Sequence, residues 1–260
     1  MKRIVVSFLF TVILLTSAAP AAFATSMATP SVFNPRIGEG NNSSLNWSGY
    51  AIAGSQGSIT TVSGSWIVPS VTCGKGSTTY AAFWAGIDGF NSNTVEQAGT
   101  LGQCSHGAAS YTAWYEFYPA GSVTIASVTV TPGDLVSVTV SYNSGIFTVT
   151  LIDGNQAPFT TTGSVANAAL SSAECIAERP SIGGSITNLA NFGTAEFGQD
   201  YTIIPSTCSA TVGGVTGTFG TFGPALQEIT MVNRHGRILA QPSGISTDGS
   251  SFTVTWHASN

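Results

Sequence analysis

Short runs of alternating apolar and polar residues dominate the chain from Leu45 onward. The stretch Ser127–Gly154 holds three of them, separated by a Pro-Gly-Asp and an Asn-Ser-Gly triplet. Their apolar positions are Val128 and Val130, then Leu135, Val136, Val138 and Val140, then Phe147, Val149 and Leu151. A period of two residues bounded by turn-forming residues is typical of β-strands joined by tight turns. This stretch therefore predicts strand, turn, strand, turn, strand.

Similar runs recur along the chain, at residues 59–71, 81–87, 108–119, 194–204 and 250–259. No segment shows a sustained helical period with caps. The 43% of apolar residues is ample for a core, so the thirty glycines are assigned to turns and bulges rather than to disorder. We predict an all-β fold, one antiparallel β-sandwich of two large sheets over residues 45–260.

The N-terminal 24 residues have the pattern of a secretory signal peptide. A basic start precedes the apolar run Ile4–Leu15, and small residues lead to Ala24. That run is shorter than the ~20 residues that span a bilayer, which argues against a membrane anchor. Residues 25–44, rich in Ser, Asn, Pro and Gly, are interpreted as a leader or short pro-segment. The sequence thus predicts a secreted protein, free of the membrane once the signal is removed.

Only 7% of residues are charged. Beyond residue 24 five basic residues face twelve acidic ones, a net charge of −7 (5 − 12). Five scattered basic residues form no patch for a phosphate backbone, so nucleic acid is excluded as a partner. A scarcity of carboxylates also suits an acidic medium. We expect a monomer.

Four cysteines, Cys73, Cys104, Cys175 and Cys208, follow the signal segment. An even number in an exported chain predicts two disulfides, for which three pairings exist. Cys73–Cys104 and Cys175–Cys208 are favoured because each closes a moderate loop. No cysteine or histidine spacing indicates a metal site. The stretches NNSS (residues 41–44) and NWS (residues 46–48) fit the acceptor pattern for N-glycosylation.

Two glutamates stand four residues apart in the stretch SSAECIAERPS, residues 171–181. Pro180 opposes a helix, and the neighbouring runs favour a sheet. In a strand, Glu174, Ile176 and Glu178 share one face, and the small Cys175 and Ala177 occupy the other.

Two further stretches carry polar residues among aromatic ones. In FWAGIDGFNSNTVEQAGT, residues 83–100, Trp84 and Asp88 share one parity, and Gln97 follows a loop of Gly, Asn and Ser. In YTAWYEFYPAG, residues 111–121, the alternating positions are Trp114, Glu116 and Tyr118. Because both faces of the second run are aromatic, one face packs on the core and the other is a candidate binding surface.

These motifs resemble those of the glutamic peptidases, the eqolisin family. Seven stretches occur in the family's order between about residues 45 and 197: NWSGYA, GSWIVPSV, FWAGIDG, EQAG, AWYEFYP, AECIAERP and LANFGTAEF. The resemblance implies a lectin-like sandwich of concanavalin shape and a secreted acid endopeptidase that acts on polypeptides with a Gln/Glu dyad and no cofactor. Motif by motif, the catalytic glutamine matches Gln97 and the catalytic glutamate matches Glu178.

The same resemblance assigns accompanying roles to other residues. Asp88, Trp84, Trp114, Glu116, Tyr118 and Glu174 are expected to bind substrate or to orient the dyad. The chain departs from the family at Cys175, where tryptophan is usual, at Glu96, where an apolar residue is usual, and at Asn191, where aspartate is usual.

The chemistry can also be argued from the residues themselves. Peptide hydrolysis needs a base for water, a donor for the oxyanion and an acid for the leaving nitrogen. A carboxylate at Glu178 could serve as base and then as acid, and the amide of Gln97 could bind the oxyanion. With an ordinary pKa of about 4.3 the glutamate would be active at mildly acidic pH.

Other interpretations of the same residues remain open at this point. Gln97 could be an ordinary hydrogen-bonded amide, and Glu178 could be an edge carboxylate that is paired with Arg179 or faces water. A lectin-like sandwich could bind sugars on Trp84, Trp114 and Tyr118. Glu116 and Glu178 could also be the two carboxylates of a glycoside hydrolase, which would place them roughly 5–10 Å apart.

Overall fold

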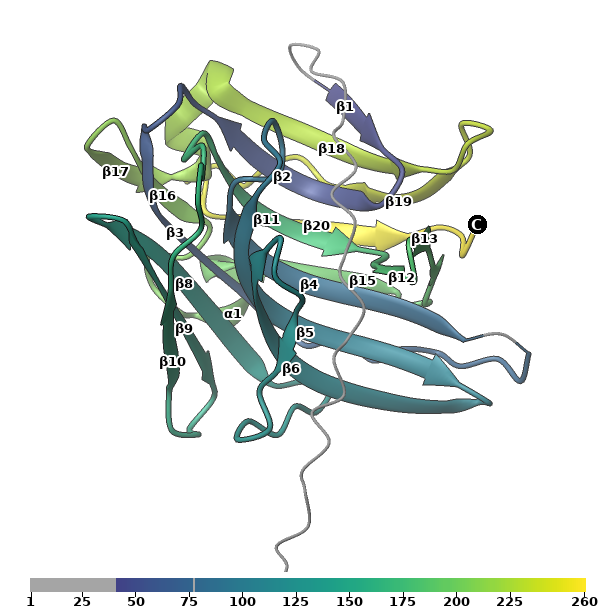
Figure 1. Ribbon diagram of the computed structural model, residues 1–260. Coiled ribbons are helices and arrows are strands. Elements are labelled where there is room, and N and C mark those ends of the chain that lie inside the picture. Colours follow the sequence, from purple (N-terminus) through teal and green to yellow (C-terminus); the bar gives the residue numbers. More distant parts are fainter. Residues whose placement is uncertain (1–40, 77) are drawn as a thin grey trace, which may run out of the picture.

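The computed structural model describes residues 41–76 and 78–260. They form two large β-sheets, packed face to face and joined at one edge (Figure 1). The predicted antiparallel β-sandwich is therefore confirmed. The expected signal peptide, and the leader up to residue 40, lie outside the described residues. Within them, no helix is long and apolar enough to cross a bilayer.

The first sheet carries the candidate site. Its strands, in spatial order, are β1 (Asn41–Ser44), β18 (Leu226–Val232), β2 (Trp47–Ala53), β11 (Ser172–Glu178), β4 (Thr79–Ile87), β5 (Val95–Ser105), β6 (Ala108–Tyr118) and β7 (Val123–Thr124). All neighbours are antiparallel except β1 and β18, which are parallel. The short β14 (Asn188–Leu189) adds a parallel pairing to β4.

The second sheet covers one face of the first. Its order is β19 (Ile238–Pro242), β20 (Ser251–Trp256), β15 (Thr194–Gly198), β3 (Ile59–Ile67), β8 (Leu135–Asn143), β9 (Ile146–Asp153) and β10 (Phe159–Gly163). The hairpin of β16 (Ser209–Val212) and β17 (Val215–Thr218) pairs with β3. Pairing between β18 and β19 makes the two sheets continuous.

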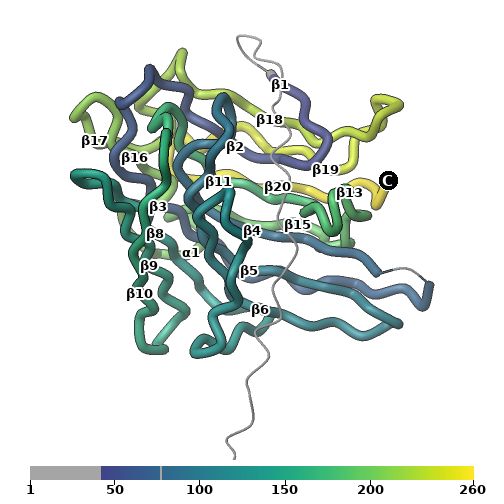
Figure 2. The backbone as a smooth tube through the Cα atoms, in the orientation of Figure 1, coloured from purple at the N-terminus to yellow at the C-terminus, as the bar shows by residue number. Residues whose placement is uncertain are grey.

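Three small elements complete the chain. They are the hairpin of β12 (Ser181–Ile182) and β13 (Ser185–Ile186), the four-residue helix α1 (Gln199–Thr202) and the 3₁₀ segment η1 (Phe219–Ala225). The tube in Figure 2 shows the C-terminus near the end of the molecule that carries β13 and β19.

The core lies between the two sheets. Trp66 of β3 is fully buried and donates its indole N–H to the hydroxyl of Thr100 on β5 (2.9 Å). Close approach of the sheets requires Gly64 on β3. A Cβ at this position would lie 2.7 Å from the Cβ of Ala85 and 2.8 Å from the Sγ of Cys175. The sequence therefore sets the sheet spacing here by omitting a side chain.

The strand predictions were mostly confirmed, with two corrections. Val128 and Val130 are buried as expected, but they lie outside any strand. The side-chain amide of Gln156 takes the place of a neighbouring strand, because it both donates to and accepts from the backbone of Thr129. The stretch 194–204 is only half strand. Strand β15 ends at Gly198, and α1 begins at the next residue. Gly198 has a φ of 96°, a backbone conformation that favours glycine.

Residues 41–44, the last four of the expected leader, form β1 at the edge of the first sheet. The expectation of two disulfides needs correction. Of the two favoured disulfides, Cys73–Cys104 is formed and joins the β3–β4 connection to β5. Cys175 and Cys208 are instead buried free thiols. They are in hydrogen-bond contact, and burial raises the pKa of Cys175 well above its usual value.

Candidate active site

The candidate residues gather on the face of the first sheet that points away from the second sheet. The strand register aligns them in three rows across β2, β11, β4, β5 and β6. The rows are Ala51, Glu174, Gly86, Gln97 and Glu116; Gly49, Ile176, Trp84, Gly99 and Trp114; and Trp47, Glu178, Ala82, Leu101 and Thr112. Because side chains alternate along a strand, each row lies on the same face. We call this surface the active face.

The predicted division of β11 into two faces is confirmed. Ile176 belongs to a small apolar cluster on the active face, with Trp47, Trp84 and Trp114. Cys175 and Ala177 belong to the main core between the sheets. Glu174 and Glu178 therefore share the active face.

Glu178 is buried and is held by two donors from other strands. The Trp84 indole Nε1 donates to Oε2 (2.8 Å), and the Asn46 amide Nδ2 donates to Oε1 (3.1 Å). In the described part of the chain no ion pair joins Glu178 to Arg179. The interpretation of Glu178 as a surface carboxylate paired with Arg179 is therefore wrong.

Gln97 is also buried, and it is held by Glu116. Its Nε2 donates to the Glu116 carboxylate at 2.8 Å, whereas its Oε1 has no partner among protein atoms. The rows of Gln97 and Glu178 are four residues of β4 apart, roughly 13 Å along the strands, and one strand separates β5 from β11. Each side chain is thus fixed by its own partners, and no hydrogen bond joins the two within the described residues.

The carboxyl groups of this face have raised pKa values. Burial raises the pKa of Glu178 to about 7, against the lowering effect of hydrogen bonds from Trp84 and Asn46 and of the nearby Trp47 indole. Burial, together with the charge of Glu178, raises the pKa of Glu116 to about 8 although Gln97 donates to it. The sequence predicted an ordinary pKa for Glu178. The difference arises because loss of water disfavours the charged form.

Glu174 has a different environment from Glu178. It is fully buried, and neither of its carboxyl oxygens has a hydrogen-bond partner of good geometry. Burial raises its pKa well above the usual value, and the charges of Asp88 and Glu96 add to the rise.

Asp88 lies at the end of β4 and anchors the chain that enters β11. Its carboxylate accepts from the backbone N–H groups of Leu170 (2.7 Å) and Ser171 (2.8 Å). The Thr94 hydroxyl also donates to it, at 3.4 Å. Asp88 makes no hydrogen bond to Gln97 or Glu178. Its role is to fix the chain that leads into β11.

The aromatic candidates surround the two carboxyl rows. The rings of Trp84 and Trp47 meet edge to face, with centroids 4.9 Å apart. Gly99 gives Trp84 its room, because a Cβ there would lie 2.7 Å from the Cβ of Trp84. Trp114 and Tyr118 lie on the same face of β6, as their parity predicted.

Sequence reasoning missed two residues of the site, Asn46 and Trp47. Both belong to the NWSGYA motif, but Asn46 and Glu178 are 132 residues apart in the chain, so no local pattern could reveal their contact. Asn46 is fully buried, which rules out a glycan at the NWS stretch. Asn46 and Trp47 therefore belong to the environment that orients Glu178.

The active face concentrates buried polar atoms that lack a protein partner. Seven of the twelve such side-chain atoms among the described residues lie there: Trp47 Nε1, Gln97 Oε1, Trp114 Nε1, Glu116 Oε1, Ser172 Oγ and both oxygens of Glu174. Such atoms are rare in proteins and call for an explanation. A peptide backbone, with its alternating donors and acceptors, offers matching groups. In the same residues no cluster of three metal-ligating side chains occurs.

Comparison with known proteins identifies the class to which this fold and site belong. Residues 45–240 match the Peptidase A4 family, and the chain belongs to this family. It is 32% identical to aspergillopepsin-2 of Aspergillus niger over 237 residues, which cover 82% of this chain and 78% of that protein. It is 35% identical to scytalidopepsin B of Scytalidium lignicola over 99 residues, which cover 38% and 36% of the two chains.

Solved structures agree at the level of the fold. Scytalido-glutamic peptidase with a transition-state analogue inhibitor matches with a TM-score of 0.67 and 22% identity, over 82% of this chain and 98% of that chain. Aspergilloglutamic peptidase from Aspergillus niger matches with a TM-score of 0.55 and 28% identity, over 69% and 99%. The resemblance to the eqolisins is confirmed. The chain is a hydrolase of the glutamic peptidase class. The family match favours this class over the lectin and glycoside hydrolase alternatives.

Proposed function

We propose that this protein is a secreted endopeptidase that hydrolyses peptide bonds with Gln97 and Glu178. The observation that carries the proposal is their common place on the active face, each buried and fixed by separate partners, with their rows roughly 13 Å apart along the strands. Glu174 lies in the row of Gln97, with only Gly86 between them, and is the alternative base on the same face. Secretion rests on the N-terminal sequence pattern. Family membership supports polypeptides as the substrates.

In the proposed reaction the carboxylate of Glu178 takes a proton from water. The water oxygen then attacks the peptide carbonyl carbon, and the oxyanion that forms accepts a hydrogen bond from the Gln97 amide. The protonated Glu178 returns its proton to the leaving nitrogen as the C–N bond breaks. Both groups act without forming a covalent intermediate with the substrate, and one carboxyl group serves as base and then as acid.

The surrounding contacts suit these roles. Trp84 and Asn46 donate to the two oxygens of Glu178 and so favour its charged form against the effect of burial. Glu116 fixes the Gln97 amide, which aims the group without using both of its N–H donors. A donor that is already oriented needs little reorganisation when the oxyanion forms.

Digestion of casein tests this proposal, with the Glu178→Gln variant as the matched control. We expect cleavage by the wild type in the presence of a chelator and of serine- or cysteine-directed reagents, and none by the variant. Loss of activity in the chelator, restored by zinc, would assign the enzyme to another class. Cleavage of a polysaccharide panel in place of casein would revive the glycosidase alternative.

A further inference from the structure

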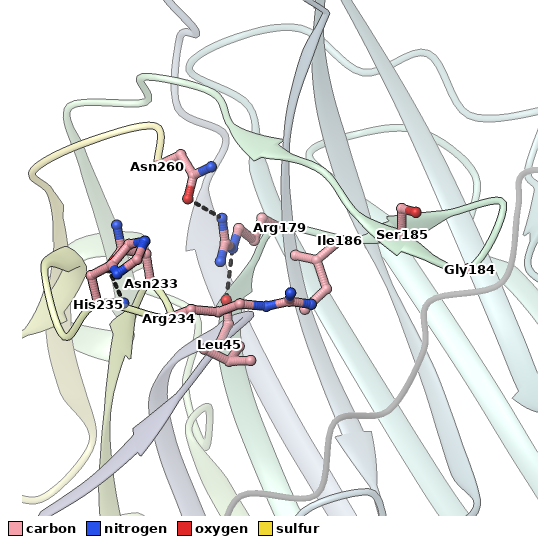
Figure 3. Close-up of a pocket in the computed structure, with 9 residues that line it drawn as sticks. All are labelled: Leu45, Arg179, Gly184, Ser185, Ile186, Asn233, Arg234, His235 and Asn260. Atoms are coloured by element: carbon pink, nitrogen blue, oxygen red, sulfur yellow. Dashed lines mark hydrogen bonds between the residues drawn. The ribbon is translucent and has the colours of Figure 1, made fainter.

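A polar pocket of about 530 Å³ lies beside the active face, at the end of the sheet where β11 stops. It is formed by the start of β2, the β12–β13 hairpin, the β18–β19 turn and the C-terminal segment (Figure 3). Its lining residues are Leu45, Arg179, Gly184, Ser185, Ile186, Asn233, Arg234, His235 and Asn260. The volume falls within the usual range for small-ligand sites.

The pocket gathers positive charge in an acidic protein. Two of the chain's seven Lys and Arg residues, Arg179 and Arg234, line it, and no acidic side chain does. A third, Arg237, donates to a carboxylate oxygen of the terminal residue Asn260 at its rim (3.2 Å), so its charge is paired there, whereas Arg179 and Arg234 have no such partner among the described residues. With twelve acidic residues in the chain, such a concentration of cations stands out against the overall charge.

Arg179 is a buried cation without a counter-ion. Only 5% of its surface is exposed, and no carboxylate pairs with it in the part of the chain that the structure describes. Its Nε donates to the Leu45 carbonyl (2.6 Å), and one terminal nitrogen makes a long contact with the Asn260 side chain (3.5 Å). Burial and the positive charge of Arg234 both lower its pKa. Buried charges in proteins are normally paired, so this guanidinium has unused capacity for an anion.

We propose that this pocket binds an oxyanion group, a carboxylate or a phosphate, between Arg179 and Arg234. A guanidinium presents parallel N–H donors that match two oxygens of such a group. An anion would offset the repulsion between the two cations, and Ser185 and His235 add polar groups to the wall.

Two sources could supply the oxyanion. Arg179 follows Glu178 directly, and Leu45 precedes Asn46, so the pocket begins one residue from the groups that hold the reactive carboxyl. A peptide on the active face could therefore deliver an acidic side chain or its terminal carboxylate. A free oxyanion from the medium could bind by the same contacts.

The test compares the full-length wild type with two matched charge variants, Arg234→Gln and Lys75→Gln. Both replaced side chains are exposed, but Lys75 lies on the β3–β4 connection away from the pocket. With inorganic phosphate as the probe, thermal shift should show binding by the wild type and by Lys75→Gln. Arg234→Gln should bind at least tenfold more weakly.

The second arm measures binding of peptides that differ only in Glu or Gln at one position, in the Glu178→Gln background so that no turnover is needed. Preference for the Glu peptide that disappears with Arg234→Gln identifies the substrate as the source of the oxyanion. Phosphate binding without that preference identifies a free oxyanion. Both results support the site, whether or not Glu178 proves catalytic.

A third variant guards against a trivial folding defect. Arg234→Glu places a carboxylate near Arg179, so it should melt at a higher temperature than Arg234→Gln without ligand and should not respond to phosphate. The proposal is overturned if neither probe binds the wild type, or if Arg234→Gln and Lys75→Gln bind phosphate equally well.

Discussion

The two faces of the first sheet are built from the same strands but follow different packing rules. On the core face, Ala85, Cys175 and Ala177 are small, and Gly64 of the opposite sheet leaves no space between the layers. On the active face, Gln97 and Glu178 are buried among tryptophans, and several polar atoms have no protein partner. Unpartnered buried side-chain atoms occur on the core face only at Ser48 and Glu96 among the described residues of these strands, and they are more numerous on the active face, where a peptide backbone offers matching groups.

The largest effect on activity is expected when Gln97 or Glu178 on the active face is replaced. Glu178→Gln keeps the shape but removes the proton acceptor, and Gln97→Ala removes the oxyanion donor. We expect kcat/KM on one peptide to fall by roughly 100- to 1,000-fold in each, because one such donor contributes about 3–4 kcal/mol to the transition state. The double variant should be little worse than either single one, since the two share a step.

Glu174→Gln is the matched control for that measurement. It changes the other carboxyl on the same face of β11, which has no part in the proposed reaction. It should retain most of the activity, with circular dichroism unchanged in all four variants. An inactive Glu174→Gln beside an active Glu178→Gln would show that the roles of the two glutamates are reversed.

A substitution at the core face should change the free energy of unfolding and leave the activity unchanged. Gly64→Val would push a side chain against Ala85 and Cys175, where even a Cβ lies closer than 3 Å. We expect a loss of about 3 kcal/mol in the free energy of unfolding, measured by urea denaturation. Activity per folded molecule should stay near the wild-type value. A variant of unchanged stability would show that the sheets can separate at low cost.

The pH dependence of activity sharpens the role of Glu178. Its pKa of about 7 means that the charged form falls tenfold for each pH unit below that value. If the carboxylate starts the reaction, kcat/KM at pH 5 should be about 100-fold below its plateau near neutrality. From the ordinary glutamate pKa of about 4.3, the sequence alone predicted that activity would decline only at a lower pH. Full activity at pH 4 would instead show that the protonated carboxyl acts first.

Stability should depend on pH in the opposite sense to that of a protein held by ion pairs. Burial, with the charge of Asp88 as a smaller contribution, raises the pKa of Glu96 to about 9, and Glu116 and Glu178 have raised values of about 8 and 7. Above pH ~4.5 the unfolded chain releases these protons while the folded chain keeps them. Stability is then complete below that pH and falls as the pH rises toward the folded pKa values, by up to about 1.4 kcal/mol per unit for each group.

Melting temperatures between pH 4 and pH 8 measure this trend, and Glu96→Gln provides the control. Glu96 points to the core face, opposite Ile87 and Phe117, and takes no part in the proposed reaction. Its replacement should flatten the decline above pH 5 without changing kcat/KM. A melting temperature that rises from pH 4 to pH 7 would contradict neutral burial of these carboxyl groups.

Much of the fold follows from local pattern. Alternation over residues 135–151 and 108–118 predicted strands that the structure contains, because a two-residue period allows only one face to be buried. The same parity placed Glu174, Ile176 and Glu178 together before any partner strand was known. Where the pattern failed, at Val128 and Val130, the side chain of Gln156 satisfied a backbone that a strand would otherwise have paired.

The sequence by itself determined the all-β class, the family and the common face of Glu174, Ile176 and Glu178, because these depend on periodicity and on ordered motifs. Tertiary structure alone decided that Asn46 and Trp84 hold Glu178, that Arg179 does not, and that Cys175 and Cys208 lie beside each other as free thiols. It also decided the pKa of Glu178. Burial and long-range contacts arise from segments far apart in the chain, so no local stretch of sequence specifies them.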